Sequence, residues 1–210
     1  MSSQIIFATV ISYFLGSIPT AYIFGRLFKG VDIRQHGSGN VGATNAFRVL
    51  GKGPGVVVLL IDILKGVLAT TLVPEMLELN KIWQYVLLAL IVVCGHNWTI
   101  FLNFKGGKGI ATSFGVLIGL TIQIATIRPV LIVTVVTWLV VFLLTGFVSL
   151  ASVVAASFLP LVMVMTNQST AIVILGVVFC LFVVLRHRKN IKRLLKGEES
   201  RVFFPFQKRP

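Results

Sequence analysis

The chain has 210 residues, of which 56% are hydrophobic and only 12% are charged. This composition excludes a water-soluble fold, which needs more polar residues to cover its surface, and it also excludes a disordered chain or a disulfide scaffold. Nineteen Lys and Arg against six Asp and Glu give a formal net charge of +13, which favours anionic partners such as nucleic acid, lipid headgroups or phosphorylated substrates. We therefore predict an integral membrane protein.

Apolar stretches long enough, or nearly long enough, to cross a hydrocarbon core of about 30 Å follow one another along the chain. We expect spans at residues 4–24, 55–73, 82–94, 110–127, 130–144, 147–165 and 170–185. The third and fifth are short and borrow residues from their flanks, and the break at 145–146 is the weakest boundary, so six spans is the alternative count. Continuous apolar runs without a period of two argue against a β-barrel. The predicted fold is an all-α bundle of seven transmembrane helices in a single membrane domain, residues 1–210.

The basic residues lie mainly on one side of these spans. With the N-terminus outside, sixteen Lys and Arg fall in the inner loops 25–54 and 95–109 and in the tail 186–210, two fall outside, and Lys65 lies within a span. This is the positive-inside pattern. It predicts an outer N-terminus, a cytoplasmic C-terminus, and polar clusters that all face the cytoplasm.

The first polar cluster lies in the loop 25–54. Small hydroxyl and amide side chains among glycines let backbone N–H groups approach an anion, and Arg48 follows at an offset that suits one helical face. The candidate residues are Ser38, Gly39, Asn40, Thr44, Asn45 and Arg48. The alternative is a flexible Gly/Ser/Asn loop.

The second cluster precedes the fourth predicted span. Three glycines around two lysines can place a lysine and bare N–H groups at a helix N-terminus, although the spacing is not that of a Walker A loop. The candidates are Lys105, Gly106, Gly107 and Lys108, with His96 at the edge of the preceding span. A positive-inside anchor is the alternative for the lysines, and a hydrogen-bonded structural histidine or a proton carrier are the alternatives for His96.

The third cluster opens the tail. On a helix, Arg186, His187, Asn190 and Arg193 fall on one side and can point at one ligand. The alternative is a polybasic tail that binds anionic lipid. Within the second span, Asp62 and Lys65 are spaced i, i+3, and we interpret them as a structural ion pair because ionisable residues in a bilayer usually face a partner. We expect the three clusters to meet in a single cation-lined site at the inner membrane surface. Together they are rich in donors and poor in carboxylates, which suits more than one phosphate group on substrates with an apolar tail.

Several spaced signatures resemble the bacterial acyl-phosphate:glycerol-3-phosphate acyltransferase family. They are Asp32-Ile33-Arg34 through Gly51, Asp62-x-x-Lys65-Gly66, Gly95-His96 through Thr112, and Arg186-His187 through Glu199. Two positions depart from the family pattern: Thr99 stands where Pro is usual, and Gly146 stands where a basic residue usually precedes Phe147-Val148-Ser149-Leu150.

The resemblance implies transfer of a fatty acyl chain from acyl phosphate to the 1-hydroxyl of glycerol 3-phosphate, giving lysophosphatidic acid and inorganic phosphate. It implies a multi-pass protein of the bacterial plasma membrane with a cytoplasmic site, and a soluble enzyme that supplies acyl phosphate. No cofactor, metal or nucleic acid is expected. The rival hypothesis is a transporter of a phosphorylated metabolite, which should show inverted repeats or broken helices near the midplane.

The resemblance also guides the site residues. Glycerol 3-phosphate is expected against the catalytic set Ser38, Arg48, Lys108, His187 and Asn190. Acyl phosphate is expected against Gly39, Asn40, Thr44, Gly106, Gly107, Lys108 and Ser149, with Asn45, Lys105, Arg186, Arg193 and His96 as further binding residues. The proton of the attacking hydroxyl goes to the donor's own phosphate, with His96 or His187 as the alternative acceptor.

Overall fold

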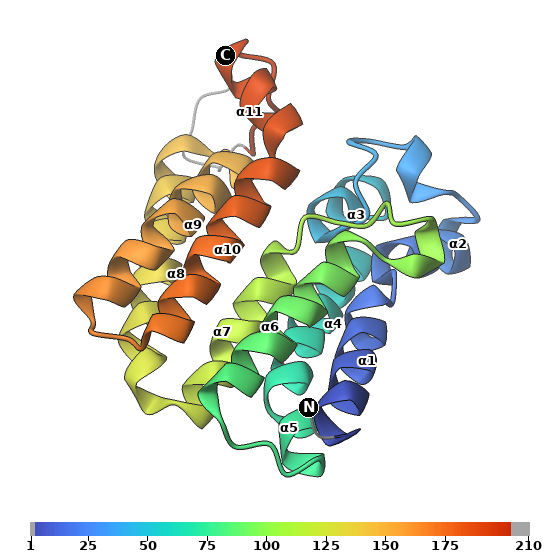
Figure 1. Ribbon diagram of the computed structural model, residues 1–210. Coiled ribbons are helices and arrows are strands. Elements are labelled where there is room, and N and C mark those ends of the chain that lie inside the picture. The colour runs from blue at the N-terminus through green and yellow to red at the C-terminus, as the bar shows by residue number, and fades with distance from the viewer. Residues whose placement is uncertain (1–2, 203–210) are drawn as a thin grey trace. The chain divides into compact units, whose positions relative to one another are not determined.

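The computed structural model describes residues 3–202, and every regular element in that range is a helix (Figure 1). In chain order the α-helices are α1 (Ser3–Ser17), α2 (Thr20–Lys29), α3 (Ala43–Val49), α4 (Lys52–Thr70), α5 (Leu72–Met76), α6 (Ile82–Asn97), α7 (Ile110–Gln123), α8 (Arg128–Thr145), α9 (Val148–Met165), α10 (Thr170–Arg186) and α11 (Arg188–Leu195). Short 3-10 helices lie at η1 (Ile33–Gln35), η2 (Ile100–Leu102) and η3 (Ala125–Ile127). The all-helical prediction is confirmed.

The described part of the chain contains five helical segments that are long and apolar enough to cross a membrane. They are Ser3–Lys29, Lys52–Met76, Ile82–Leu102, Ala125–Thr145 and Val148–Met165, and α10 with α11 makes a sixth if this pair, bent by 60°, counts as one span. Helix α7 has 14 residues, and the fourth predicted span is therefore shorter than a full crossing. The count of seven and the outward N-terminus stay predictions.

Two predicted boundaries have a clear outcome. Helices α8 and α9 are separate, because Gly146 takes a left-handed backbone with φ of 72° and ends α8. The predicted run 4–24 is interrupted, since α1 ends at Ser17 and α2 begins after Pro19, which has no backbone N–H to continue the helical ladder. The break leaves the Ile18 carbonyl outside regular helix.

The chain forms two compact units, residues 1–125 and 126–210. Within the first unit, close helix packing depends on glycines. A Cβ on Gly16 of α1 would overlap the backbone of Val92 of α6, and one on Gly115 of α7 would overlap the backbone of Ile63 of α4. Small residues let helix backbones approach each other in this way in membrane proteins, where no hydrophobic effect drives helices together.

In the second unit, α9 packs against α8, α10 and α11. The indole N–H of Trp138 donates to the Ser152 hydroxyl at 3.2 Å, which ties α8 to α9. The prediction of one membrane domain over 1–210 is a statement about how the two units combine, and it stays a prediction.

Candidate active site

The loop before α3 is folded around the side chain of Asn45. Its amide nitrogen donates to the carbonyls of Ile33 and His36, both at 3.1 Å, and its amide oxygen accepts from the backbone N–H of Ser38 at 2.9 Å. Asn45 is fully buried, whereas Ser38 is exposed. Asn45 thus uses its hydrogen bonds to shape the loop and to hold Ser38 at the surface.

Two of the cations in this region are engaged in the loop's own structure. Asp32 lies 2.6 Å from Arg34 and 3.7 Å from Arg26, and the hydrogen bond from Arg34 lowers the pKa of Asp32 to about 2. Arg48 differs: it lies in the last turn of α3, is exposed, and makes no ion pair within residues 3–202. Thr44 is exposed one turn earlier on α3, while Gly39 and Asn40 are half-buried. Arg48 is therefore the cation of this cluster that remains available to an anion.

The glycine–lysine loop, residues 105–109, rests on the end of α6. The backbone N–H of Gly106 donates to the Asn97 carbonyl at 3.2 Å, and that of Gly107 donates to the His96 carbonyl at 3.0 Å. A Cβ at either glycine would overlap His96, so only glycine permits this close approach. Gly106 and Gly107 are buried, Lys108 is half-buried and Lys105 is exposed.

The same loop leads directly into α7. Gly109 precedes the helix with φ of 77°, and no side chain caps the first turn, so the N–H groups at this helix end can attract an anion beside Lys108. The structure also joins the first two clusters, because a Cβ on Gly107 would lie 2.9 Å from the Val41 carbonyl. Segments more than 60 residues apart in the sequence therefore meet here, as the sequence predicted for these two clusters.

The third cluster lies in the second unit, where the α10–α11 bend falls at His187 (Figure 1). His187 is buried, and its Nδ1 lies 2.8 Å from the Val183 carbonyl. Because a carbonyl only accepts, this contact assigns a hydrogen to Nδ1. Asn190 is buried on α11, and Arg186 is half-buried at the end of α10. The meeting of this cluster with the first two stays a prediction.

A carboxylate that the sequence analysis did not select holds the third cluster together. The side chain of Glu199 accepts from Ser149 at 2.8 Å, from Asn190 at 2.6 Å and from Arg193 at 2.7 Å. Three of the predicted site residues, from α9 and α11, thus meet at one anion. Glu199 ends the last family signature, and its place there is the feature of the sequence that could have identified it. A search for cations and neutral donors does not select a carboxylate.

The pKa of Glu199 is lowered, which makes the stability of the tail depend on pH. Burial raises this pKa, but the hydrogen bonds from Asn190, Arg193 and Ser149 outweigh burial and lower it below the ordinary value of 4.5. The folded carboxylate therefore stabilises the tail above pH 4.5, and this contribution is lost as the pH falls through the lowered pKa.

We expect Glu199→Gln to loosen the tail at neutral pH as acid does in the unmodified protein. Loss of a charge-assisted network worth about 1.5 kcal/mol should make amide exchange at residues 199–202 roughly tenfold faster. Hydrogen exchange read by mass spectrometry measures this. Glu198→Gln, one residue earlier and exposed, is the matched control, and equal exchange in the two variants would contradict the prediction.

The two departures from the family pattern have structural counterparts. The Gly146 carbonyl accepts from the Val202 N–H at 2.9 Å, and a Cβ on Gly146 would overlap the Val202 carbonyl. Gly146 thus supplies a backbone contact to the tail in place of a cation. The Thr99 hydroxyl donates to the Ser17 carbonyl at 2.5 Å, which ties the segment between α6 and η2 to the end of α1.

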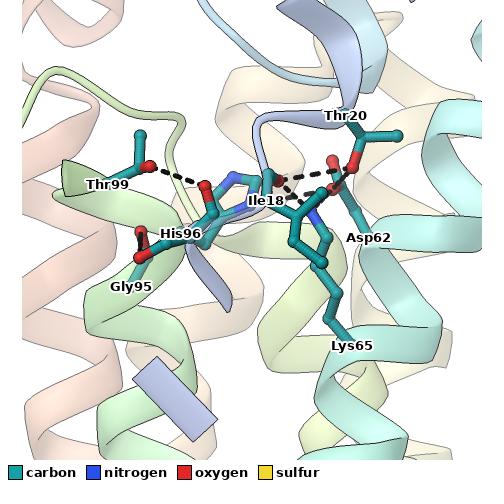
Figure 2. A network of polar contacts seen from close by, with 8 residues as sticks. Ile18, Thr20, Asp62, Lys65, Gly95, His96 and Thr99 are labelled. Carbon is teal, nitrogen blue, oxygen red and sulfur yellow. Dashed lines mark hydrogen bonds and ion pairs between the residues drawn. The ribbon is translucent and has the colours of Figure 1, made fainter. Parts of the chain in front are cut away.

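A polar network inside the first unit surrounds the α1–α2 break (Figure 2). Lys65 Nζ lies 2.6 Å from Asp62 Oδ1 and donates to the Ile18 carbonyl at 2.5 Å, and the Thr20 hydroxyl donates to Asp62 at 3.0 Å. Asp62 and Lys65 are each only 2% exposed. The predicted structural ion pair is confirmed, and the carbonyl left by the break in α1–α2 is satisfied by a buried lysine.

Comparisons with known proteins agree with one another. A family model described as glycerol-3-phosphate acyltransferase matches residues 6–197. Curated relatives described as glycerol-3-phosphate acyltransferase include one from Desulforudis audaxviator, 46% identical over 92% of this chain and 93% of its own, and one from Synechococcus sp. (strain CC9902), 44% identical over 96% of each.

Two solved structures of the integral membrane glycerol 3-phosphate acyltransferase PlsY (YgiH) also match, each 36% identical over 96% of both chains. The glycerol 3-phosphate form superposes with a TM-score of 0.86, and the lysophosphatidic acid form with 0.83.

Proposed function

The chain belongs to the glycerol-3-phosphate acyltransferase family, and from that premise we propose that it takes its acyl group from acyl phosphate. The acceptor is the sn-1 hydroxyl of glycerol 3-phosphate, and the products are lysophosphatidic acid and inorganic phosphate. This is the first acylation step of phospholipid biosynthesis. The observation that carries the proposal is the meeting of the loop before α3 with the glycine–lysine loop at Val41 and Gly107.

The reaction needs compensation of the substrates' negative charge more than it needs a nucleophilic side chain of the protein. The hydroxyl oxygen attacks the carbonyl carbon, an ester bond forms, and the bond from that carbon to the phosphate oxygen breaks with its electron pair leaving on phosphate. Acyl phosphate is already activated, so no covalent enzyme intermediate is required. The protein has to overcome repulsion between two anionic substrates and hold the hydroxyl and the carbonyl in line.

The proposed site distributes the two phosphate groups over the three clusters. Glycerol 3-phosphate binds Ser38, Arg48, Lys108, His187 and Asn190. Acyl phosphate binds Gly39, Asn40, Thr44, Gly106, Gly107, Lys108 and Ser149, with Lys105, Arg186 and Arg193 adding positive charge around them. Support comes from the exposed Ser38, Thr44 and Arg48 and from the uncapped start of α7 beside Lys108. Asn45 acts by shaping the loop that presents Ser38.

We assign the proton of the attacking hydroxyl to the leaving phosphate of the donor. No carboxylate base is among the proposed site residues, so the alternative acceptor is a histidine; in His187 the hydrogen on Nδ1 toward Val183 leaves Nε2 as the basic nitrogen. We expect the pH–rate profile of His187→Gln to keep the acidic limb of the unmodified enzyme, because a general base is inactivated by protonation at low pH. Loss of that limb would move the proton to His187.

We propose that the reaction takes place at a bacterial plasma membrane, which the chain crosses several times, with the site facing the cytoplasm. The donor's acyl chain stays in the lipid, and a soluble enzyme delivers acyl phosphate to the inner surface. Support comes from the apolar spans and from the gathering of Lys and Arg in the loops that carry the clusters.

The decisive experiment uses the purified chain in a lipid mesophase with palmitoyl phosphate and glycerol 3-phosphate. Phosphate release and the mass of the lipid product are measured together. We expect turnover with palmitoyl phosphate and none with palmitoyl-CoA or palmitoyl acyl carrier protein. Turnover with palmitoyl-CoA alone would overturn the donor assignment.

The α1–α2 break bears on the rival transporter hypothesis, because transporters carry substrate sites at broken helices. Lys65 fills this break, and the cavity beside it, lined by Thr20, His96 and Gly107 among others, has a volume of about 10 Å³. Such a cavity has room for about one water molecule. The described break therefore favours an enzyme that works at the membrane surface over a carrier with a buried substrate site.

A further inference from the structure

We propose that Asp62 and Lys65 act through His96 as positioning residues, holding the glycine–lysine loop in the geometry that binds acyl phosphate. The inference rests on the proposed function and adds to it a polar network that the mechanism above does not use.

The first step is the location of the buried charges. Asp62 and Lys65 lie on α4, are almost completely buried, and neutralise each other at 2.6 Å. Figure 2 shows this pair beside the α1–α2 break, with Thr20 on one side and His96 on the other. Lys65 also donates to the Ile18 carbonyl, but this contact does not involve His96 and does not explain why a histidine lies beside the pair.

The second step is the contact between the pair and His96. The Nδ1 of His96 lies 3.8 Å from Asp62 Oδ1, and the histidine is only 8% exposed. This separation exceeds a hydrogen bond, so the interaction is an electrostatic one between the carboxylate and the Nδ1 edge of the ring. A carboxylate on this side favours a hydrogen on Nδ1 and fixes the orientation of the ring.

The third step runs from His96 to the loop. The Nε2 edge of the ring faces Gly107 so closely that a Cβ there would overlap it, and the His96 carbonyl accepts from the Gly107 N–H at 3.0 Å. On another side of Gly107 lies the Val41 carbonyl. Gly107 is thus enclosed between His96 and the loop before α3, and the position of the ring determines where Lys108 and the start of α7 lie.

A reacting group displaced by about 1 Å can cost a factor of about 100 in rate, and this gives the network a function that simple stability does not. If the pair only stabilised the helix break, removal of its charges would leave the conformation of the glycine–lysine loop unchanged. If the pair positions the loop, changes at Asp62–Lys65 and at His96 act on the same quantity, the affinity for acyl phosphate.

The test is a double-mutant cycle between the pair and the histidine. One arm is Asp62→Asn with Lys65→Met, which removes both charges together and avoids leaving one buried and unpaired. The other arm is His96→Gln. We expect each arm to raise the KM for palmitoyl phosphate about tenfold and the KM for glycerol 3-phosphate by less, because Lys108 is the one loop residue proposed to bind the acceptor. The combined variant should be no worse than either arm.

A second readout requires no turnover. Amide exchange at residues 105–109 should rise in both arms and in the combined variant, while α4 and α6 stay protected. If the unmodified protein does not turn over palmitoyl phosphate, the proposed function fails, but the exchange data still decide the positioning role. His36→Gln, an exposed histidine outside the network, is the matched control and should change neither readout.

KM changes that multiply in the combined variant would overturn the proposal, as would a fall in thermal stability with an unchanged KM and unchanged loop exchange. Should the neutral-pair variant fail to fold, Thr20→Val replaces it in the cycle. This change keeps both charges and removes only the hydroxyl that donates to Asp62 at 3.0 Å. It should raise the KM for palmitoyl phosphate a few-fold, again without adding to His96→Gln.

Discussion

Replacing Arg48 with Met is expected to lower kcat/KM for glycerol 3-phosphate by about 100- to 1000-fold, the range seen when one preorganised donor to a reacting anion is removed. Arg48 is exposed at the end of α3 and makes no ion pair within residues 3–202, so its charge is not consumed by the loop's own structure. A guanidinium can also hold a phosphate through two parallel hydrogen bonds, which methionine cannot replace.

The matched control for Arg48→Met is Lys52→Met. Lys52 is exposed, lies four residues further on and begins α4, so this variant loses the same charge from the start of the next helix. We expect kcat/KM within about threefold of the unmodified enzyme, because an unpositioned surface charge contributes only screened attraction. Both variants should melt within about 2 °C of the unmodified protein, since exposed substitutions change stability little. Equal activity losses would show that net charge, not the position of Arg48, is responsible.

The sequence predicted the helices well because their signal is local. Apolar runs and the single break at Gly146 are properties of neighbouring residues. The interruption at Pro19 was missed, although proline lacks the N–H that a helix needs, because the apolar character of the run continues through it. Full span length also depends on neighbours, and α7 shows that an apolar run can form a helix too short to cross.

The candidate site was predicted less completely, for a different reason. A search for cations and donors finds Arg48 and Lys108 but cannot tell which polar side chains are used up within the protein. The side-chain amide of Asn45 hydrogen-bonds to the loop itself, and Glu199 accepts hydrogen bonds from Ser149, Asn190 and Arg193. Both roles depend on contacts between residues separated in sequence, and a composition or spacing argument carries no information about which carbonyl or carboxylate will face them.

The two lysines of the glycine–lysine loop could not be ranked from sequence, but their environments differ in the structure. Lys105 is exposed, whereas Lys108 is half-buried, follows the two buried glycines and precedes Gly109 at the uncapped start of α7. A charge close to a helix N-terminus and partly shielded from water acts more strongly on an anion than one in open solvent.

Lys108→Met should therefore lower kcat by about 100- to 1000-fold, because the leaving phosphate would lose its nearest positioned cation. Lys105→Met, the matched variant with the same loss of charge in the same loop, should cost less than about fivefold, and this smaller loss should shrink further as salt is added, because screening weakens an exposed charge first. Steady-state kinetics with palmitoyl phosphate at low and high ionic strength measures both effects. If the two lysines proved equal, or if the loss at Lys108 vanished in salt, then burial beside the glycines would not select the catalytic cation, and the loop would act only as a diffuse attractor of anionic substrates.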